Sequence, residues 1–262
     1  MNKELKFWLF ISRRLPNWKV STVFLNRIVI PFYNRKRRPD VICNVSGSEM
    51  ELRPYEFLDA ALLFYPHIYD AKEINYVSSL VQKDWIFVDV GAHIGFYSIT
   101  FSKKLKEGRV IAIEADPGNA GRFKKNLTLN PGITNIEMVE RGVSDKIEVL
   151  SLGISTTGNT SGNSFLSTSS KRIDIQCQPL LEIVQNQNCQ KINFLKIDIE
   201  GFEFRVFKQF FSTAPKSIFP EWILVEDNPT LVQEGNAIDL LLAHGYLLYK
   251  DFGLNKLMKH AA

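Results

Sequence analysis

The sequence has few cysteines and no long apolar run. Its three cysteines, Cys43, Cys177 and Cys189, are odd in number and far apart, which indicates neither a disulfide framework nor a cysteine metal site. The most apolar N-terminal run, FWLFI at 7–11, is far shorter than the roughly 18 residues of a membrane span. It is also too short for a secretory signal peptide, and Arg13 follows it closely. We therefore expect a protein of the reducing cytoplasm.

Internal repeats and a strong overall charge are also missing. With 262 residues, 45% hydrophobic and 23% charged, the chain can bury a substantial core, which excludes a disordered or disulfide-stapled protein. The net charge of +4 is an average over two unlike parts. Residues 1–40 hold 10 Lys and Arg against 2 Asp and Glu, a net of +8, and the remainder holds 22 against 26, a net of −4. A basic head therefore precedes an acidic body.

From residue 85 onward, short apolar β-branched runs alternate with segments of helical period. This alternation predicts an α/β fold, with a mostly parallel sheet covered by helices on both faces. The expected strands are residues 85–90, 109–114, 135–140, 192–198 and 221–226. The expected helices are residues 94–105, 117–130, 202–211 and about 229–244. An antiparallel pair, 246–252 with 254–260, is expected to end the chain.

Two segments depart from this alternation. Residues 151–170 contain 16 Ser, Thr, Gly or Asn out of 20, between strand-like stretches, and predict a hairpin tip or a lid. Residues 1–80 lack a clear period, apart from a short hydrophobic helix around 7–11 and a small hairpin within 42–54. We therefore predict an N-terminal extension, residues 1–80, packed on a core domain of residues 81–262.

The strongest local signal is VDVGAHIGFYSIT, residues 88–100. A strand ends near Asp89, Gly91 and Gly95 bracket a tight turn, and a helix follows at once. Backbone N–H groups at such a helix start can meet a negatively charged group. The spacing is D-x-G-x-x-x-G, so the dinucleotide fingerprint is incomplete. Glu114 ends the next strand, where a carboxylate can accept both hydroxyls of a ribose. Together these features predict an adenosine-containing ligand at the carboxyl edge of the sheet.

The charge at this edge favours one adenosine compound over the others. Carboxylates follow the expected strands at Asp89, Glu114, Asp116, Asp145, Asp198, Glu200, Glu226 and Asp227. A pyrophosphate would be repelled there, and no Walker lysine motif is present to neutralise it. S-adenosylmethionine, with a sulfonium, an ammonium and one carboxylate, suits an acidic crevice, so methyl transfer is favoured over hydride transfer. An NAD-dependent oxidoreductase or sugar-nucleotide enzyme is the alternative, and a non-catalytic binding protein with the same fold is another.

Three stretches between about residues 68 and 250 resemble the FkbM-like family of S-adenosylmethionine-dependent methyltransferases. They are IYDAKEINYVSSLVQKDWIFVDVGAHIGFYSI, IEADPGNAGRFKKNLTLN and FLKIDIEGFEFRVF. The last, residues 194–207, is close to the family's K-I-D-x-E-G-x-E signature and is the most specific. The sequence departs from the family at His93, where Asn is more frequent, and in the basic head. The resemblance implies a Rossmann-like, seven-stranded methyltransferase sheet and O-methylation of a hydroxyl, commonly on a sugar, glycolipid or polyketide.

The resemblance also implies the residues of the site. The methionine part of the cofactor would contact Asp89, Gly91, Ala92, His93 and Gly95. The ribose would lie at Glu114, with Ala115 beside it, and the adenine along the turn after the third strand, Gly142, Val143 and Ser144. The catalytic residues after the fourth strand would be Lys196, Asp198 and Glu200.

Two of these carboxylates are candidate general bases. Strand alternation and the following turn can place Asp198 and Glu200 at the same edge, within reach of an acceptor hydroxyl. Three plainer roles remain open. Asp89 could cap the helix behind the turn, Glu114 could be a solvated strand end, and Asp198 could cap the helix at 202–211.

No metal ligand is assigned. Hard oxygen ligands for Mg²⁺ are nevertheless available from adjacent strand ends, at Asp198, Glu226, Asp227 and Asn228. A divalent metal beside S-adenosylmethionine is therefore an open alternative that we do not favour.

The basic head, residues 1–40, has three possible explanations. It can be a solvated helix face packed on the core, a peripheral contact with the inner membrane surface, or a contact with nucleic acid or another partner. The basic cluster Arg35–Arg38 and the aromatic FWLF segment suit an anionic membrane. The body is acidic and no RNA-binding motif occurs. We therefore expect a small-molecule or glycan substrate and no nucleic-acid partner.

Overall fold

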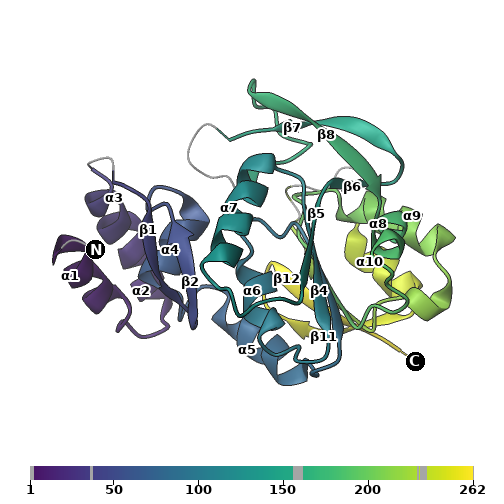
Figure 1. The fold of residues 1–262 in the computed structure, drawn as a ribbon, viewed down its shortest axis with the longest axis horizontal. Helices are drawn as coiled ribbons and strands as arrows, with labels where there is room; N and C mark the ends of the chain where they lie inside the picture. The colour runs from purple at the N-terminus through teal and green to yellow at the C-terminus, as the bar shows by residue number, and fades with distance from the viewer. Residues whose placement is uncertain (1–2, 36–37, 156–161, 229, 231–234, 262) are drawn as a thin grey trace.

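The structure is a computed structural model that describes the chain except for residues 1–2, 36–37, 156–161, 229, 231–234 and 262. Within this part of the chain, seven strands form a central sheet in the order β11-β12-β10-β9-β3-β4-β5 (Figure 1). They are β3 (Ile86–Val90), β4 (Arg109–Glu114), β5 (Ile136–Glu140), β9 (Phe194–Ile197), β10 (Trp222–Glu226), β11 (Tyr246–Asp251) and β12 (Asn255–His260). Six of these strands run in the same direction, and β12 runs opposite to them. The predicted seven-stranded α/β fold is confirmed.

The central strands are buried on both faces because their apolar side chains alternate between two hydrophobic layers. In β4, Val110 and Ala112 join one layer, and Ile111 and Ile113 join the other. The edge strand β5 differs, since most of its residues are only half-buried. Its side chains still contact both layers, Ile136 and Met138 on one face and Val139 on the other. The greater exposure follows from the edge position, where no further strand among the described residues pairs with β5.

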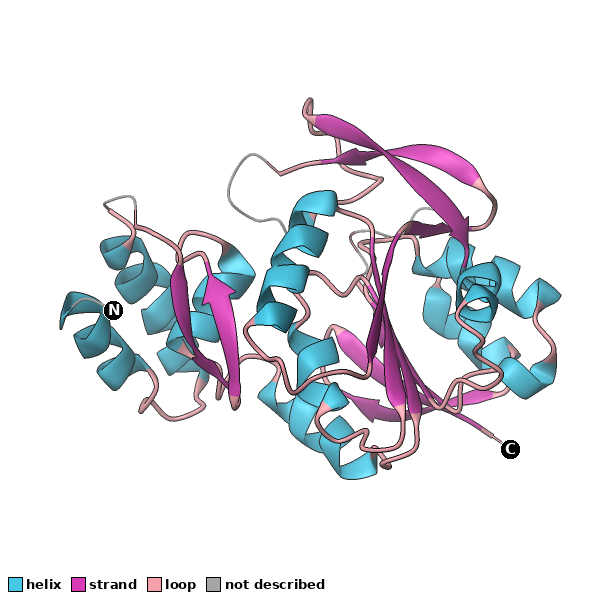
Figure 2. Cartoon of the chain, in the orientation of Figure 1, coloured by secondary structure: helices cyan, strands magenta, loops and turns pink. Residues whose placement is uncertain are grey.

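Helices cover both faces of the sheet (Figure 2). The layer that contains Val110 packs against α5 (Ala71–Leu80), α6 (Phe96–Ser102) and α7 (Pro117–Thr128). The layer that contains Ile111 packs against α8 (Leu180–Asn186), α9 (Glu203–Thr213) and α10 (Ala237–Ala243), with a short 3₁₀ turn, η3 (Lys216–Ile218), nearby. The last helix was predicted from about residue 229, but in the structure it begins at Ala237, where the Asn236 side chain caps it. Residues 229 and 231–234 of that prediction lie outside the described residues.

A second, three-stranded sheet lies beside the first, in the order β6-β8-β7. Its strands are β6 (Gly142–Ser144), β7 (Glu148–Gly153) and β8 (Arg172–Pro179). The antiparallel pairing of β7 with β8 confirms the strands predicted around the 151–170 segment. The segment predicted as a turn, Gly142–Ser144, is instead the strand β6, because it pairs with β8.

The described residues between Lys3 and Tyr65 form a lobe at one end of the molecule (Figure 1). We call residues 3–65 the N-terminal lobe. It contains α1 (Lys3–Ser12), α2 (Lys19–Phe24), a π-helical turn η1 (Leu25–Val29), α3 (Ile30–Tyr33), the hairpin β1 (Val41–Val45) and β2 (Ser48–Leu52), and α4 (Phe57–Phe64). The short helix and the hairpin were predicted, whereas the helices over 19–33, 57–64 and 71–80 were not. No helix within the described residues is both long and apolar enough to cross a membrane.

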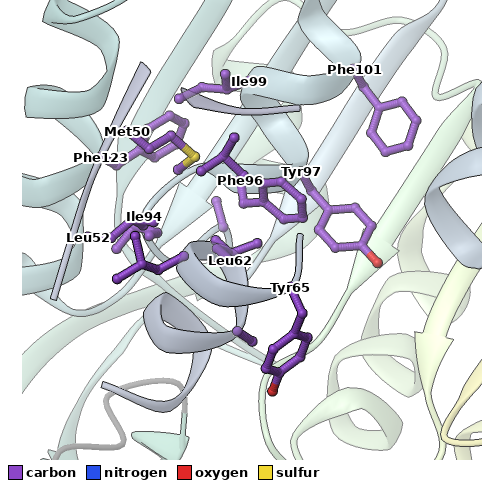
Figure 3. Packing of buried hydrophobic residues seen from close by; sticks show 14 of the residues in the cluster. Met50, Leu52, Leu62, Tyr65, Ile94, Phe96, Tyr97, Ile99, Phe101 and Phe123 are labelled. Atoms are coloured by element: carbon purple, nitrogen blue, oxygen red, sulfur yellow. The ribbon is translucent and has the colours of Figure 1, made fainter. Parts of the chain in front are cut away.

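The N-terminal lobe packs on α7 through β2. The backbone N–H of Glu51 donates to the side-chain oxygen of Asn126 at 2.8 Å. Met50 and Leu52 belong to the same buried cluster as Ile94 and Phe123 (Figure 3). The hydrophobic layer on this face of the sheet therefore continues into the lobe.

Candidate active site

A cavity of about 420 Å³ lies at the carboxyl ends of the central strands, a volume that suits a small-molecule ligand. Most of the predicted site residues line it: Asp89, Gly91, Ala92, His93, Glu114, Ala115, Val143, Lys196, Asp198 and Glu200. Three others do not belong to its lining: Gly95, Gly142 and Ser144. The structure therefore brings residues from four separate stretches of sequence to one cavity.

The glycine turn after β3 has a steric reason for each glycine. Gly91 has a φ of +78°, and a Cβ there would lie 2.0 Å from the backbone oxygen of Asp198. Gly95 has a φ of +86°, and a Cβ there would lie 2.2 Å from the ring of Phe123. Gly91 thus allows the turn to lie directly against the end of β9, whereas Gly95 allows α6 to pack on α7.

Glu114 holds this turn from the neighbouring strand. Its carboxylate accepts the backbone N–H of His93 at 2.7 Å and the backbone N–H of Asp116 at 2.8 Å. Only 6% of the residue is exposed, so the alternative of a solvated strand end is wrong. Burial raises its pKa to about 7. Each carboxylate oxygen can accept a second hydrogen bond, which leaves capacity for hydroxyl groups of a ligand.

A chain of charges runs along the cavity from the buried Asp89 through Lys196 to the partly exposed Asp198. Asp89 and Lys196 are neighbours in the register of β3 and β9, with the Lys196 ammonium 3.8 Å from the Asp89 carboxylate and 3.4 Å from that of Asp198. Burial lowers the pKa of Lys196, but Asp198 and Asp89 outweigh it, and the net shift is upward. Lys196 is therefore a stable cation between two carboxylates.

Asp89 also supports the helix behind the turn. It is fully buried and accepts the Ser98 hydroxyl at 2.6 Å. Burial raises its pKa, while Lys196 and the hydroxyl and backbone N–H of Ser98 act in the opposite direction. Asp89 therefore combines the capping role and the cavity role that the sequence left as alternatives.

Three carboxylates meet at the cavity: Asp198, Glu200 and Glu226, with one oxygen of each within 4.8 Å of the others. We call these residues the acidic triad. Burial, and after it the charge of Asp198, raises the pKa of Glu200 to about 7 and that of Glu226 to about 8. Such a group could ligate a divalent cation. Asp227, one of the predicted ligands, does not belong to it.

Glu203, the first residue of α9, holds the turn that precedes this helix, whose N-cap residue is Phe202. The Glu203 carboxylate accepts the backbone N–H groups of Ile199 at 2.8 Å and Gly201 at 3.0 Å. The alternative that Asp198 caps this helix is therefore wrong, and the Asp198 carboxylate faces the cavity instead. Another predicted edge carboxylate, Asp145, does not line the cavity, and it accepts the Nε of Arg205 at 2.6 Å.

The sequence analysis did not predict several of the residues that line the cavity. They come from separate elements, and spacing along the chain does not indicate that these elements meet. Tyr97, which lies within the predicted helix 94–105, donates its hydroxyl to Asp70 at 3.0 Å, and Asp70 itself has a φ of +45°. Burial raises the pKa of Asp70 to about 6. The other missed residues with aromatic or polar groups include Phe57, Tyr69, Phe96, Asn119, Arg141, Asn163, Phe165 and Asn255.

The described part of the 151–170 segment forms one wall of the cavity. Asn163 donates to the carboxylate of Asp116 at 2.6 Å, and the Ser164 hydroxyl donates to the backbone oxygen of Glu200 at 2.9 Å. The ring of Phe165 lies 5.3 Å from that of Phe202. The predicted tip lies in part outside the described residues, at 156–161.

Comparison with known proteins gives a family match over more than half of the chain. Residues 89–248 match the model of the methyltransferase FkbM domain. Methyltransferase sdnD of Sordaria araneosa is 24% identical over 178 residues, 56% of this chain and 65% of that protein. Methyltransferase 1 of Beauveria bassiana is 24% identical over 148 residues, 48% of this chain and 58% of that protein. The matched regions thus cover less than two thirds of either relative.

Solved structures show a weaker likeness. The crystal structure of precorrin-6y C5,15-methyltransferase from Geobacter metallireducens is 15% identical and has a TM-score of 0.43. The match covers 72% of this chain and 85% of that chain.

Proposed function

The chain belongs to the FkbM methyltransferase family, and from this premise we propose that it is an S-adenosylmethionine-dependent O-methyltransferase. The proposed acceptor is a hydroxyl of a saccharide, a glycolipid or a related natural product. We base this on one observation: the acidic triad and the glycine turn with Glu114 line the same cavity. A proton acceptor and a candidate cofactor site thus share one volume.

The residues present fit S-adenosylmethionine. The carboxylates of Asp70 and Asp89 suit its sulfonium and ammonium groups, because opposite charges attract strongly where water is largely excluded. The remaining acceptor capacity of Glu114 suits ribose hydroxyls. When bound, the cofactor supplies a methyl group activated by its positively charged sulfur.

The residues of the chain would position the acceptor and take its proton. Well-oriented reactants can contribute on the order of 7–11 kcal/mol toward the barrier. Asp198 or Glu200 would accept the hydroxyl proton as the oxygen attacks the methyl carbon. A base is most effective when its pKa lies near the working pH, and burial raises the pKa of Glu200 to about 7. Lys196 would limit the repulsion between the neighbouring carboxylates.

The cavity lining supports a sugar-like acceptor. The lining includes the aromatic rings of Phe57, Phe96 and Phe165 and the amide groups of Asn163 and Asn255. Faces of aromatic rings suit the apolar faces of sugar rings, and amides suit their hydroxyl groups. The test is transfer of a labelled methyl group from S-adenosylmethionine into extracted cell-envelope glycans and lipids. Label found only in proteins or nucleic acids would contradict the acceptor class.

Substitution of the two candidate bases tests the chemistry. We expect Asp198→Asn or Glu200→Gln to lower kcat by about 10²–10⁴-fold, while S-adenosylmethionine affinity in calorimetric titration stays within a few-fold. Asp84→Asn, on an exposed residue before β3, is the matched control and should keep full activity. If both site variants keep full activity, neither carboxylate is the base. If wild type binds NAD tightly and S-adenosylmethionine not at all, the proposal fails.

The divalent-metal alternative has its own test. We propose that methyl transfer needs no metal, because Lys196 already supplies a cation beside Asp198. Activity should therefore survive EDTA treatment and dialysis. Loss of activity that Mg²⁺ restores would assign the acidic triad to a cation.

A further inference from the structure

The outer surface of the N-terminal lobe exposes an unusual number of apolar side chains. Of the eighteen large hydrophobic residues that are exposed in the described part of the chain, eight lie between residues 7 and 32. They are Phe7, Phe10, Trp18, Val20, Val23, Phe24, Ile28 and Phe32. Scattered apolar residues are normal on a protein surface, but a concentration of this kind marks an interaction site.

The helical segment from Lys19 to Tyr33, formed by α2, η1 and α3, shows the anomaly most clearly. One stripe of this segment is buried, at Ser21, Leu25, Val29 and Tyr33. The opposite stripe faces solvent and consists of Val20, Val23, Phe24, Arg27, Ile28, Pro31 and Phe32. A solvent-facing helix stripe is ordinarily polar. Here Val20 is 76% exposed and Ile28 is 54% exposed, so none of the described residues covers the stripe.

The lobe holds these helices in place from their buried side. Arg13 donates to the backbone oxygen of Leu63 at 3.0 Å, and Tyr65 donates to the side chain of Asn26 at 2.8 Å. Asn34 donates to the backbone oxygen of Pro54 at 2.6 Å. The apolar stripe is therefore presented on a fixed support.

Positive charges lie beside the exposed aromatic rings. The guanidinium of Arg14 is 3.8 Å from the ring centre of Phe10, and that of Arg35 is 4.9 Å from the ring centre of Phe32. One of the two acidic residues in the basic head, Glu4, pairs with Arg38 at 2.8 Å. The surface thus combines apolar rings with a large excess of positive charge.

We propose that this surface docks on an anionic lipid bilayer. The exposed apolar side chains would enter the headgroup boundary, while Arg14, Arg27 and Arg35 would meet lipid phosphates. Nucleic acid would satisfy the cations but leave the apolar stripe in water. A second copy would bring together two heads that each carry a net charge of +8, and like charges repel. Docking stands independently of the proposed methyl transfer.

The test is flotation of the full chain with lipid vesicles. One set of vesicles contains phosphatidylcholine only, and the other contains phosphatidylglycerol and phosphatidylcholine in a one-to-two ratio. The intact chain should float with the anionic set and much less with the neutral set. Val20→Ser/Phe24→Ser/Ile28→Ser should weaken binding at least about tenfold through lost apolar contact. Arg14→Gln/Arg27→Gln/Arg35→Gln should weaken anionic binding by about a hundredfold.

A matched control removes exposed apolar side chains elsewhere. Ile147 and Val149 are 65% and 53% exposed outside the lobe, and Ile147→Ser/Val149→Ser should float like wild type. Unchanged melting temperatures would show that the variants remain folded. The proposal is overturned if the intact chain ignores anionic vesicles, or if the lobe variants float as it does. If the intact chain does not bind vesicles but binds short RNA, the surface is assigned to nucleic acid. If it does not bind vesicles but forms a dimer that the apolar variant disrupts, the surface is assigned to a second copy of the chain.

Discussion

The N-terminal lobe and the sheet domain distribute apolar side chains in opposite ways. In α9, Val206, Phe207 and Phe210 are buried, whereas Lys208 and Ser212 face solvent. In the segment from Lys19 to Tyr33, apolar residues occupy both the buried and the exposed stripe. Of the eighteen large hydrophobic residues exposed in the described part of the chain, eleven lie in the lobe and seven in the much longer sheet domain. In a helix at the surface, an apolar residue therefore indicates the buried face only where the opposite face is polar.

The same two regions separate the charges. Carboxylates of the acidic body gather at the sheet edge around Lys196, while Arg14, Arg27 and Arg35 of the basic head are exposed on the lobe. An acidic cavity suits a cationic ligand, and a basic, apolar surface suits an anionic layer. The net charge of +4 is the sum over both regions, so by itself it indicates neither the acidic cavity nor the basic surface.

The largest expected effect concerns the ion pair that joins the two regions. Asp59 of the lobe and Arg122 of α7 pair where both are almost fully buried. We expect Asp59→Ala to lower the free energy of unfolding by about 3–5 kcal/mol, because it leaves a buried guanidinium without its partner. Denaturant unfolding followed by fluorescence measures the change.

A control on the same helix sharpens this prediction. Lys124 pairs with Glu140 at the surface, and Lys124→Ala should cost at most about 1 kcal/mol. If Asp59→Ala costs no more than this control, the lobe is not coupled to the sheet domain through the pair.

A smaller effect is expected at the glycine turn. A Cβ at Gly91 would meet the backbone of Asp198, so Gly91→Ala should destabilise the chain by about 2–3 kcal/mol and disrupt the cavity. Gly121 lies in α7, where a Cβ would meet no atom of the described residues within 4 Å, and Gly121→Ala should stabilise by about 0.5–1 kcal/mol. Thermal melting and cofactor titration of both variants would check this contrast. Equal behaviour would show that the turn tolerates a side chain.

The smallest effect is the pH dependence of stability. The pKa of Glu226 is raised from its ordinary value of 4.5 to about 8, chiefly by burial and then by Asp198. Between these values the folded chain keeps a proton that the unfolded chain releases, so this group's stabilisation is lost as the pH rises. Relative to wild type, Glu226→Gln should therefore gain about 1 kcal/mol between pH 5 and pH 8, allowing for solvent screening of a partly exposed group.

Urea unfolding at several pH values measures this difference, with Asp84→Asn as the control on an exposed carboxyl. A stability difference between Glu226→Gln and wild type that does not change with pH would contradict the raised pKa.

Much of the sheet was predictable because its information is local. Residues close together in the sequence were enough to predict the five parallel strands, the glycine turn and the K-I-D-x-E-G-x-E stretch correctly. The segment from Lys19 to Tyr33 was missed because its exposed stripe is apolar, which removes the helical contrast that periodicity depends on. Asp145 was placed at the wrong site because its carboxylate pairs with Arg205, sixty positions further along the chain.

By itself the sequence determined the fold class, the family, the glycine turn and the charge asymmetry, since each depends on residue type and spacing along the chain. Only the tertiary structure decided which carboxylates meet. Asp198, Glu200 and Glu226 come together because β9 and β10 are adjacent, while Glu203 holds the turn before α9 and Asp198 does not cap that helix. Only the tertiary structure, too, decided which apolar residues of the head are left uncovered, because burial is a property of packing and not of composition.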